Sequence, residues 1–63
     1  MNLYFLSNTG DSLWFEDQAG YEWGISYDGV IMDCEGYPMN EEWLLCGDNR
    51  DLIEALKGKL NEK

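Results

Sequence analysis

The segment Tyr21–Asp33, YEWGISYDGVIMD, limits the possible folds of this chain more than any other segment. Its first half alternates apolar residues with polar residues or glycine, which is the period-two pattern of a strand with one buried face. Asp28-Gly29 follows and supplies the two central residues of a type I′ turn, because glycine, and less readily aspartate, tolerates positive φ. Val30–Asp33 then returns as a second strand. The segment therefore predicts a β-hairpin.

A two-residue turn at this position fixes which side chains share a face of the hairpin. The pairs that it creates are Tyr27 with Val30, Ile25 with Met32, and Trp23 with Cys34. The face expected to be buried carries Tyr21, Trp23, Ile25, Tyr27, Val30, Met32 and Cys34. The opposite face carries Glu22, Gly24, Ser26, Ile31, Asp33 and Glu35. A slip of one residue would mix the two sets, so the pattern itself favours this register.

Two further strands are expected before the hairpin. Asn2–Leu6 reads as a short strand whose inward residues periodicity leaves undecided, and Ser12–Phe15 reads as the next strand. For Leu13 and Phe15 to join the apolar face, the connection to Tyr21 must contain three or five residues, and with five Phe15 pairs with Tyr21. The predicted sheet spans residues 2–35 of a single domain, residues 1–63, with a small aromatic-rich core.

The C-terminal segment, residues 49–61, predicts an amphipathic helix. Its apolar residues recur at helical spacing, Asp48 is placed to cap it, and lysines follow toward its C-terminal end. Residues 36–47 form a turn region in which Glu41–Cys46 fits either an edge strand or, slightly better, one helical turn capped by Asn40. The fold class is therefore α+β: a small antiparallel three- to four-stranded β-meander packed against one C-terminal α-helix.

The charge of the chain is strongly negative and unevenly distributed. The net charge is −9, and residues 1–49 contain ten Asp or Glu residues but no Lys or Arg. All four cations follow: Arg50, Lys57, Lys59 and Lys63. Such a field repels nucleic acid and anionic membranes and attracts basic clefts. The expected partner is therefore a basic nucleic-acid-binding protein, with no direct nucleic-acid or membrane contact.

Catalytic and cofactor chemistry find little support in the sequence. The chain has no histidine, no nucleophile elbow and no glycine-rich phosphate loop, so we expect neither an enzyme nor a cofactor. A calcium loop with Gly36 at its sixth position would begin at Ile31, which cannot be a ligand, so no metal site is expected.

The cysteines and the apolar runs indicate a cytoplasmic protein. Cys34 and Cys46 are expected to be buried thiols, with a disulfide as the alternative, and they match no zinc signature. No apolar run approaches the roughly 20 residues of a membrane span, and Met1–Leu6 is too short for a secretory signal.

The acidic face of the hairpin is the predicted functional site. In the predicted register Glu22 lies opposite Glu35, Gly24 lies opposite Asp33, and the apolar Trp14 and Ile31 lie among the acids. Like charges directly opposite destabilise a sheet, so their presence in a small domain suggests a use. The candidate partner-binding residues are Trp14, Glu16, Asp17, Glu22, Asp28, Asp33 and Glu35. A solvated face that only keeps the protein soluble is the alternative.

The chain resembles the small acidic phage-encoded inhibitors of host nucleic-acid-binding proteins, which include anti-CRISPR proteins and uracil-DNA glycosylase inhibitors. The resemblance lies in the Asp28-Gly29 hairpin and in Trp43–Asp48 followed by a helix over Asn49–Leu60, about a third of the chain. It implies a non-catalytic inhibitor in the host cytoplasm whose surface imitates DNA. An acidic immunity or antitoxin protein, or a small oligomeric assembly factor that uses its aromatics for oligomerisation, are the alternatives. So many aromatics in so short a chain also make a homodimer a candidate state of the protein.

Overall fold

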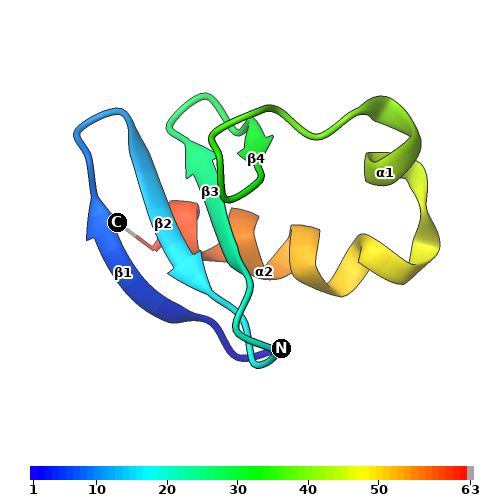
Figure 1. The fold of residues 1–63 in the computed structure, drawn as a ribbon, viewed down its shortest axis with the longest axis horizontal. Coiled ribbons are helices and arrows are strands. Elements are labelled where there is room, and N and C mark those ends of the chain that lie inside the picture. Colours follow the sequence, from blue (N-terminus) through cyan, green and yellow to red (C-terminus); the bar gives the residue numbers. More distant parts are fainter. Residues whose placement is uncertain (63) are drawn as a thin grey trace.

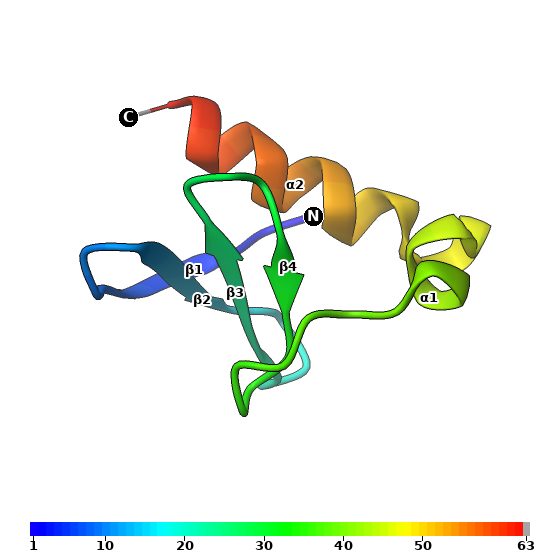
Figure 2. The ribbon, with the colours of Figure 1, turned by 90° about the horizontal axis from the view of Figure 1, so that it is seen from above.

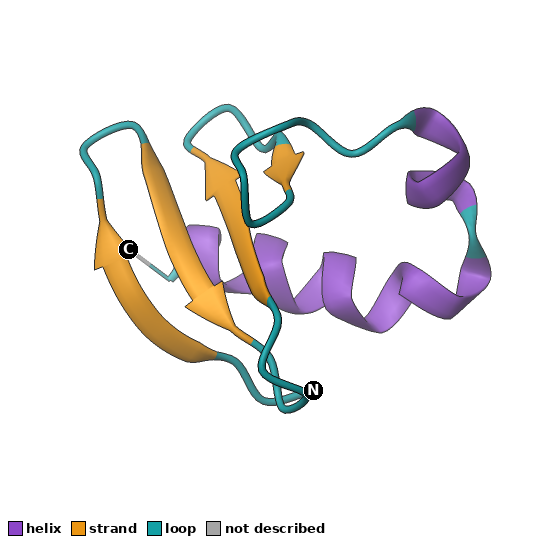
Figure 3. Ribbon diagram, in the orientation of Figure 1, coloured by secondary structure: helices purple, strands orange, loops and turns teal. Residues whose placement is uncertain are grey.

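The computed structural model describes residues 1–62 and shows a four-stranded antiparallel sheet with a helix across one face (Figure 1). The strands β1 (Tyr4–Asn8), β2 (Ser12–Glu16), β3 (Glu22–Ser26) and β4 (Ile31–Met32) are neighbours in chain order. The helices α1 (Glu41–Leu45), η1 (Gly47–Asn49, a 3₁₀ turn) and α2 (Arg50–Asn61) follow (Figure 3). The predicted α+β meander is confirmed, with four strands. Lys63 lies outside the described residues.

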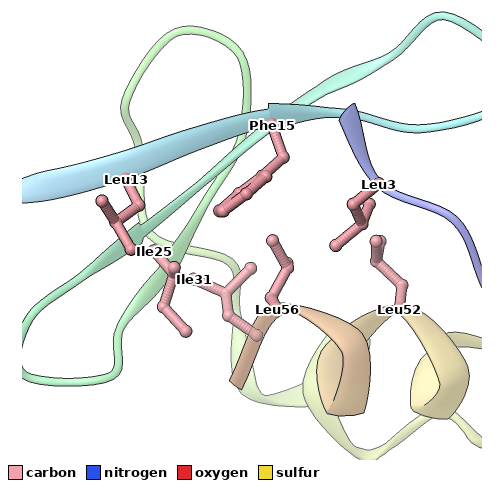
Figure 4. Packing of buried hydrophobic residues seen from close by; sticks show 7 residues of the cluster. All are labelled: Leu3, Leu13, Phe15, Ile25, Ile31, Leu52 and Leu56. Carbon is pink, nitrogen blue, oxygen red and sulfur yellow. The ribbon is translucent and has the colours of Figure 1, made fainter. Parts of the chain in front are cut away.

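The core lies between one face of the sheet and α2. Figure 4 shows side chains from β2, β3 and β4 pointing toward two leucines of α2. The buried apolar residues are Leu3, Leu13, Phe15, Ile25, Ile31, Leu52 and Leu56, of which Ile25 and Leu56 are fully buried. The predicted apolar stripe of the helix is confirmed. The burial of Leu3 also identifies the inward set of the first strand, whose Phe5 ring packs edge-on against Phe15 with centroids 5.8 Å apart.

The short helix α1 forms as the sequence favoured. Its cap is Asn40, whose side-chain oxygen accepts a hydrogen bond from the Trp43 backbone N–H at 2.8 Å. The Trp43 ring packs against that of Trp23, with centroids 5.2 Å apart. The α2 helix begins one residue later than a cap at Asp48 would imply, because Gly47–Asn49 forms a 3₁₀ turn, and Asn49 takes the cap position without a side-chain hydrogen bond.

The predicted register of the β3–β4 hairpin is wrong by one residue. Ile25 lies opposite Ile31, and Gly24 opposite Met32. The turn has three residues instead of two: the Gly29 N–H donates to the Ser26 carbonyl at 2.9 Å, and the Ser26 N–H donates to the Val30 carbonyl at 2.9 Å. Gly29, with φ 91°, is the left-handed residue that this turn with its bulge requires.

The slip exchanges the faces of the returning strand. Ile31, predicted to be an anchor on the acidic face, is buried in the core, whereas Val30 is exposed. Met32 joins the face turned away from α2, named the open face below, because it pairs with Gly24. Burying Ile31 in place of Val30 removes one more methylene from water, which favours the longer turn.

The two cysteines were predicted to be buried, and both are exposed free thiols. Cys34 follows the end of β4 in a turn, and Cys46 is the C-cap residue of α1. Each lies where regular structure ends at the surface, so neither reaches the core.

The β2–β3 pairing has the predicted parity but a different register. Phe15 lies opposite Trp23 and Leu13 opposite Ile25, so the pairing of Phe15 with Tyr21 is not observed. The reason is a connection of three residues in place of five, closed by a hydrogen bond from the Asp17 N–H to the Tyr21 carbonyl at 2.8 Å. Apolar side chains still share the buried face because both loop lengths are odd.

Trp14 lies across the open face and covers a glycine. It pairs with Gly24 on β3, and a Cβ atom at residue 24 would lie only 2.7 Å from the indole ring. Glycine within a strand commonly marks such a close approach. The half-buried Trp14 ring therefore lies flat against the strand, in the space that a side chain at residue 24 would occupy.

We expect Gly24→Ala to lower the free energy of unfolding by about 1–3 kcal/mol, because the new methyl group must push the Trp14 ring off the strand. In a Trp14→Ala background the same change should be neutral or stabilising, since the clash is gone and alanine loses less backbone entropy than glycine. Urea denaturation of the four proteins of this cycle measures both effects. Equal costs in the two backgrounds would contradict the close packing.

Candidate functional site

Two turns of this protein have the same construction. Asp17–Tyr21 reads DQAGY and Asp33–Tyr37 reads DCEGY. In each, the Asp N–H donates to the Tyr carbonyl, at 2.8 and 2.9 Å, and the Gly N–H donates to the Asp carbonyl, at 3.1 and 3.0 Å. Each glycine has positive φ, 92° and 90°. Sequence reasoning missed this device, although the repeated pattern Asp-x-x-Gly-Tyr is visible in the sequence.

Both turns lie at the same end of the sheet. One turn joins β2 to β3, and β4 runs antiparallel to β3 back to that end before the second turn begins. Figure 2 shows both turns on the side of the molecule away from α2. We name this region the acidic end, and its carboxylates belong to Glu16, Asp17, Glu22, Asp33 and Glu35. The structure therefore brings five of the seven predicted site residues to one end of the sheet.

The acids gather at an end and do not form the predicted grid on one face. The predicted pairing of Glu22 with Glu35 is wrong, because β3 and β4 pair with Gly24 opposite Met32 instead of Asp33. On its other side, toward β2, Glu22 lies opposite Glu16. In the observed register Asp33 and Glu22 belong to opposite faces of the sheet. The Asp33 side chain instead stabilises its own turn, because its Oδ1 accepts the backbone N–H groups of residues 35 and 37, at 2.9 and 3.0 Å. The one-residue slip of β4 is the cause.

Glu16 and Glu22 form the closest like-charge pair that the ladder allows. Because Asp17 and Tyr21 share a backbone hydrogen bond, the alternation of an antiparallel ladder makes Glu16 and Glu22 a non-hydrogen-bonded pair, in which side chains approach most closely. Among residues 1–62 the ion pair that forms joins Lys59 to Glu62 on α2, at 3.9 Å. The carboxylates of the acidic end are thus not neutralised by any described cation.

Asp17 is the most strongly held carboxylate of the acidic end. Its Oδ1 accepts the backbone N–H groups of Ala19 and Tyr21 at 2.9 and 3.0 Å, and its Oδ2 accepts the Trp23 indole N–H at 3.0 Å. Desolvation raises the pKa of Asp17, but the hydrogen bonds from Trp23 and from the backbone together outweigh it and leave this pKa below its usual value. Asp17 therefore stays ionised into mildly acidic conditions.

Two shallow hollows lie on either side of Glu22. The first is lined by Gly20, Tyr21, Glu22, Trp23, Asp33 and Cys34, where the chain after β4 diverges from β3. The second, on the open face, is lined by Leu6, Ser7, Thr9, Trp14, Glu22 and Cys34. Trp14 therefore lies beside the acidic end, because it lines the same hollow as Glu22.

The tyrosines of the repeated turns are functional candidates that sequence reasoning missed. Tyr21 was predicted to be in the core, but it is 67% exposed, and Tyr37 is 66% exposed. Both occupy the last position of the Asp-x-x-Gly-Tyr turn, beyond the reach of the α2 core. Asp28, in contrast, lies in the β3–β4 turn at the opposite end of the sheet, so it does not join the other candidates.

Residues 1–62 contain neither a metal-binding cluster nor a helix that could span a membrane. No group of three or more His, Cys, Asp or Glu side chains in this part of the chain is arranged to hold a metal ion. None of its helices has the length and apolar character needed to cross a membrane.

Comparisons of the chain with protein-family models, curated proteins and solved structures found no match.

We expect Asp17→Asn to destabilise the protein by about 1 kcal/mol, because the amide nitrogen that replaces Oδ2 cannot accept the Trp23 indole hydrogen bond. Asp33→Asn is the matched control, since it lies in the same kind of turn and its side chain holds the backbone through a single oxygen, Oδ1. Chemical denaturation of both variants tests the difference. Equal losses would show that the indole contact contributes nothing.

The same pair of proteins has a defined pH dependence. Because the folded-state pKa of Asp17 is lowered, its ionised form adds stability above the unfolded-state pKa and loses that contribution as the pH falls through the folded-state value. The stability difference between wild type and Asp17→Asn should therefore be constant near neutral pH and shrink below about pH 4. Denaturation across this range measures it.

Proposed function

We propose that this protein is a non-catalytic inhibitor that inserts its acidic end into a basic nucleic-acid-binding cleft of a host defence effector, as an anti-CRISPR-type protein acting in the host cytoplasm. The observation that supports this most is the concentration of five carboxylates at one end of the sheet, with no ion-pair partner among residues 1–62 and with exposed aromatic rings beside them. A uracil-DNA glycosylase or another DNA-processing enzyme is the alternative target.

The distribution of charge gives such binding a direction. The described basic side chains, those of Arg50, Lys57 and Lys59, all belong to α2, and the two acidic turns lie on the side of the molecule away from that helix (Figure 2). The molecule therefore carries a charge asymmetry that turns its acidic end toward a positive surface. Electrostatic steering of this kind raises association rates and is weakened by salt.

The spacing of the carboxylates suits a few phosphate positions. Neighbouring strands are about 4.8 Å apart, so Glu16 and Glu22 offer two adjacent negative charges. A DNA duplex carries one charge per about 1.7 Å of axis, so this small surface replaces only a few phosphates. Charge alone would then give weak, nonspecific binding, and the aromatic contacts of Trp14 and Tyr21 would supply the remaining affinity.

The hollow beside Glu22 has the chemistry to receive an arginine side chain of the target. It combines two aromatic residues, Tyr21 and Trp23, with two carboxylate residues, Glu22 and Asp33. A guanidinium group stacks on aromatic rings and hydrogen-bonds to carboxylates, and it is more weakly hydrated than an ammonium group. Basic nucleic-acid clefts present such arginines to phosphate, so the hollow would take an arginine from its usual ligand.

The double charge reversal Glu16→Lys/Glu22→Lys should weaken target binding at least tenfold, because it places cations in a basic cleft. Asp11→Lys/Asp28→Lys makes the same change in net charge at the opposite end of the sheet and should retain most of the affinity. Competition with DNA for purified Cas9-type effectors and for uracil-DNA glycosylase, at low and high salt, measures both. Equal losses in the two variants, or binding that salt does not weaken, would contradict the proposed site.

Tyr21→Ala should weaken binding of an arginine-rich peptide about five- to tenfold, because one aromatic wall of the hollow is lost. Tyr37→Ala is the matched control, since Tyr37 is equally exposed in the twin turn but does not line the hollow. NMR titration, with the Trp23 indole N–H as the reporter, measures the affinity. A lysine-rich peptide that binds as well as the arginine peptide would argue against the stacking site.

A further inference from the structure

Strand β1 presents an apolar edge that the rest of the protein leaves uncovered. It is the outermost strand of the sheet, and all five of its residues are exposed. Its exposed apolar residues are Phe5 at 62%, Tyr4 at 55% and Leu6 at 44%, and the exposed Met1 precedes the strand. A sheet edge with apolar side chains is a template for pairing with another strand.

The other edge of the sheet is protected. Beyond β4, the segment that follows folds back, with a bridge between Met32 and Pro38 and a hydrogen bond from the Met39 N–H to the Ile31 carbonyl at 2.9 Å. Within residues 1–62, β1 is therefore the full-length strand edge that no other segment of the chain covers.

The charge distribution favours a second copy of this chain as the partner that pairs with the β1 edge. Residues 1–10, MNLYFLSNTG, contain no charged side chain, although the chain carries a net charge of −9. Two copies of so acidic a protein repel each other at most surfaces, and an uncharged apolar segment is where they can meet without placing carboxylates against one another. A basic partner, by contrast, would find no carboxylate on β1 to bind.

Backbone groups of β1 point outward at Phe5. The Thr9 N–H donates to the Ser12 carbonyl at 3.0 Å, and the ladder alternates from there, so the backbone groups of Ser7 face β2. Glu16 forms a non-hydrogen-bonded pair with Glu22 on β3, so its backbone groups point toward β1, and those of its partner Tyr4 face β2. A bulge between Phe5 and Ser7 interrupts the alternation, which leaves the Phe5 N–H and carbonyl directed away from the sheet. The bulge confines regular pairing to the segment around Phe5.

We propose that two copies of this chain associate through antiparallel pairing of their β1 edges. A two-fold axis near Phe5 would join the two sheets into one of eight strands, with both α2 helices on the same side. Because the paired strands run in opposite directions, the two acidic ends lie at opposite corners of the dimer. The charges that repel most are thereby kept apart, and both acidic ends stay free for the function proposed above.

Sedimentation equilibrium across a concentration series tests the proposal. The wild-type protein should show a mass twice the 7.3 kDa of the chain, and dimerisation should strengthen with added salt, because salt screens the repulsion between the copies. Salt thus acts oppositely on the dimer and on target binding, so failure of one inference is distinguishable from failure of the other. A protein that remains monomeric at high concentration in high salt would overturn the dimer.

Charged substitutions on β1 and near β4 test whether the dimer interface lies at the β1 edge. Phe5→Glu should shift the protein to monomer by at least tenfold in dimer dissociation constant, whereas Val30→Glu, the same charge change at an exposed residue beside the other edge, should not. Circular dichroism establishes that each variant is folded. If Phe5→Glu unfolds the protein, Leu6→Glu takes its place. Equal dimerisation of wild type and the folded β1 variant would overturn the proposed edge.

Discussion

Contact between one face of the sheet and two leucines of α2 is the interaction on which the rest of the structure depends. Leu56 and Ile25 are fully buried, and the other core residues belong to the same hydrophobic cluster. A chain of this size buries only about 60% of the surface that its unfolded form exposes, so few side chains can be spared from that contact. The contact therefore decides which alternate residues of each strand face inward and leaves the remainder, with most of the acids, at the surface.

The acidic end follows from the same constraint through its turns. Each Asp-x-x-Gly-Tyr turn uses one carboxylate to hold its own backbone, and the twin turns thereby fix acids at one end of the sheet. From Asp17 a chain of contacts continues through the Trp23 indole to the Trp43 ring, and the Asn49 side chain donates to the Trp43 carbonyl at 2.9 Å. The candidate site is thus connected physically to the start of α2.

The division of the surface into charged and uncharged parts has an energetic consequence. Like charges at Glu16 and Glu22 cost stability in a domain whose total stability is small. The apolar β1 edge leaves further surface unburied on the isolated chain. Burying that edge against a second copy, and placing the acidic end against a cationic surface, would each stabilise the folded protein and offset part of this loss of stability.

The sequence determined the elements whose signals are local. The helical spacing of Leu52 and Leu56 identifies α2, the side chain of Asn40 caps α1, and alternation around Ile25 identifies β3, because each pattern involves only near neighbours. The choice of acids as the candidate site was equally local, since it rested on charge.

The tertiary structure decided the register and therefore the shape of the site. Gly29 suits both a two- and a three-residue turn, and only burial against α2 selects Ile31 over Val30 for the core. That single choice turned Met32 to the open face, left Cys34 in solvent and separated Asp33 from the face of Glu22. The local sequence therefore determined that the strands and turns carry many carboxylates, whereas packing across the whole domain decided that these carboxylates gather at one end of the sheet. The reason is that strand register depends on contacts between residues distant in the chain.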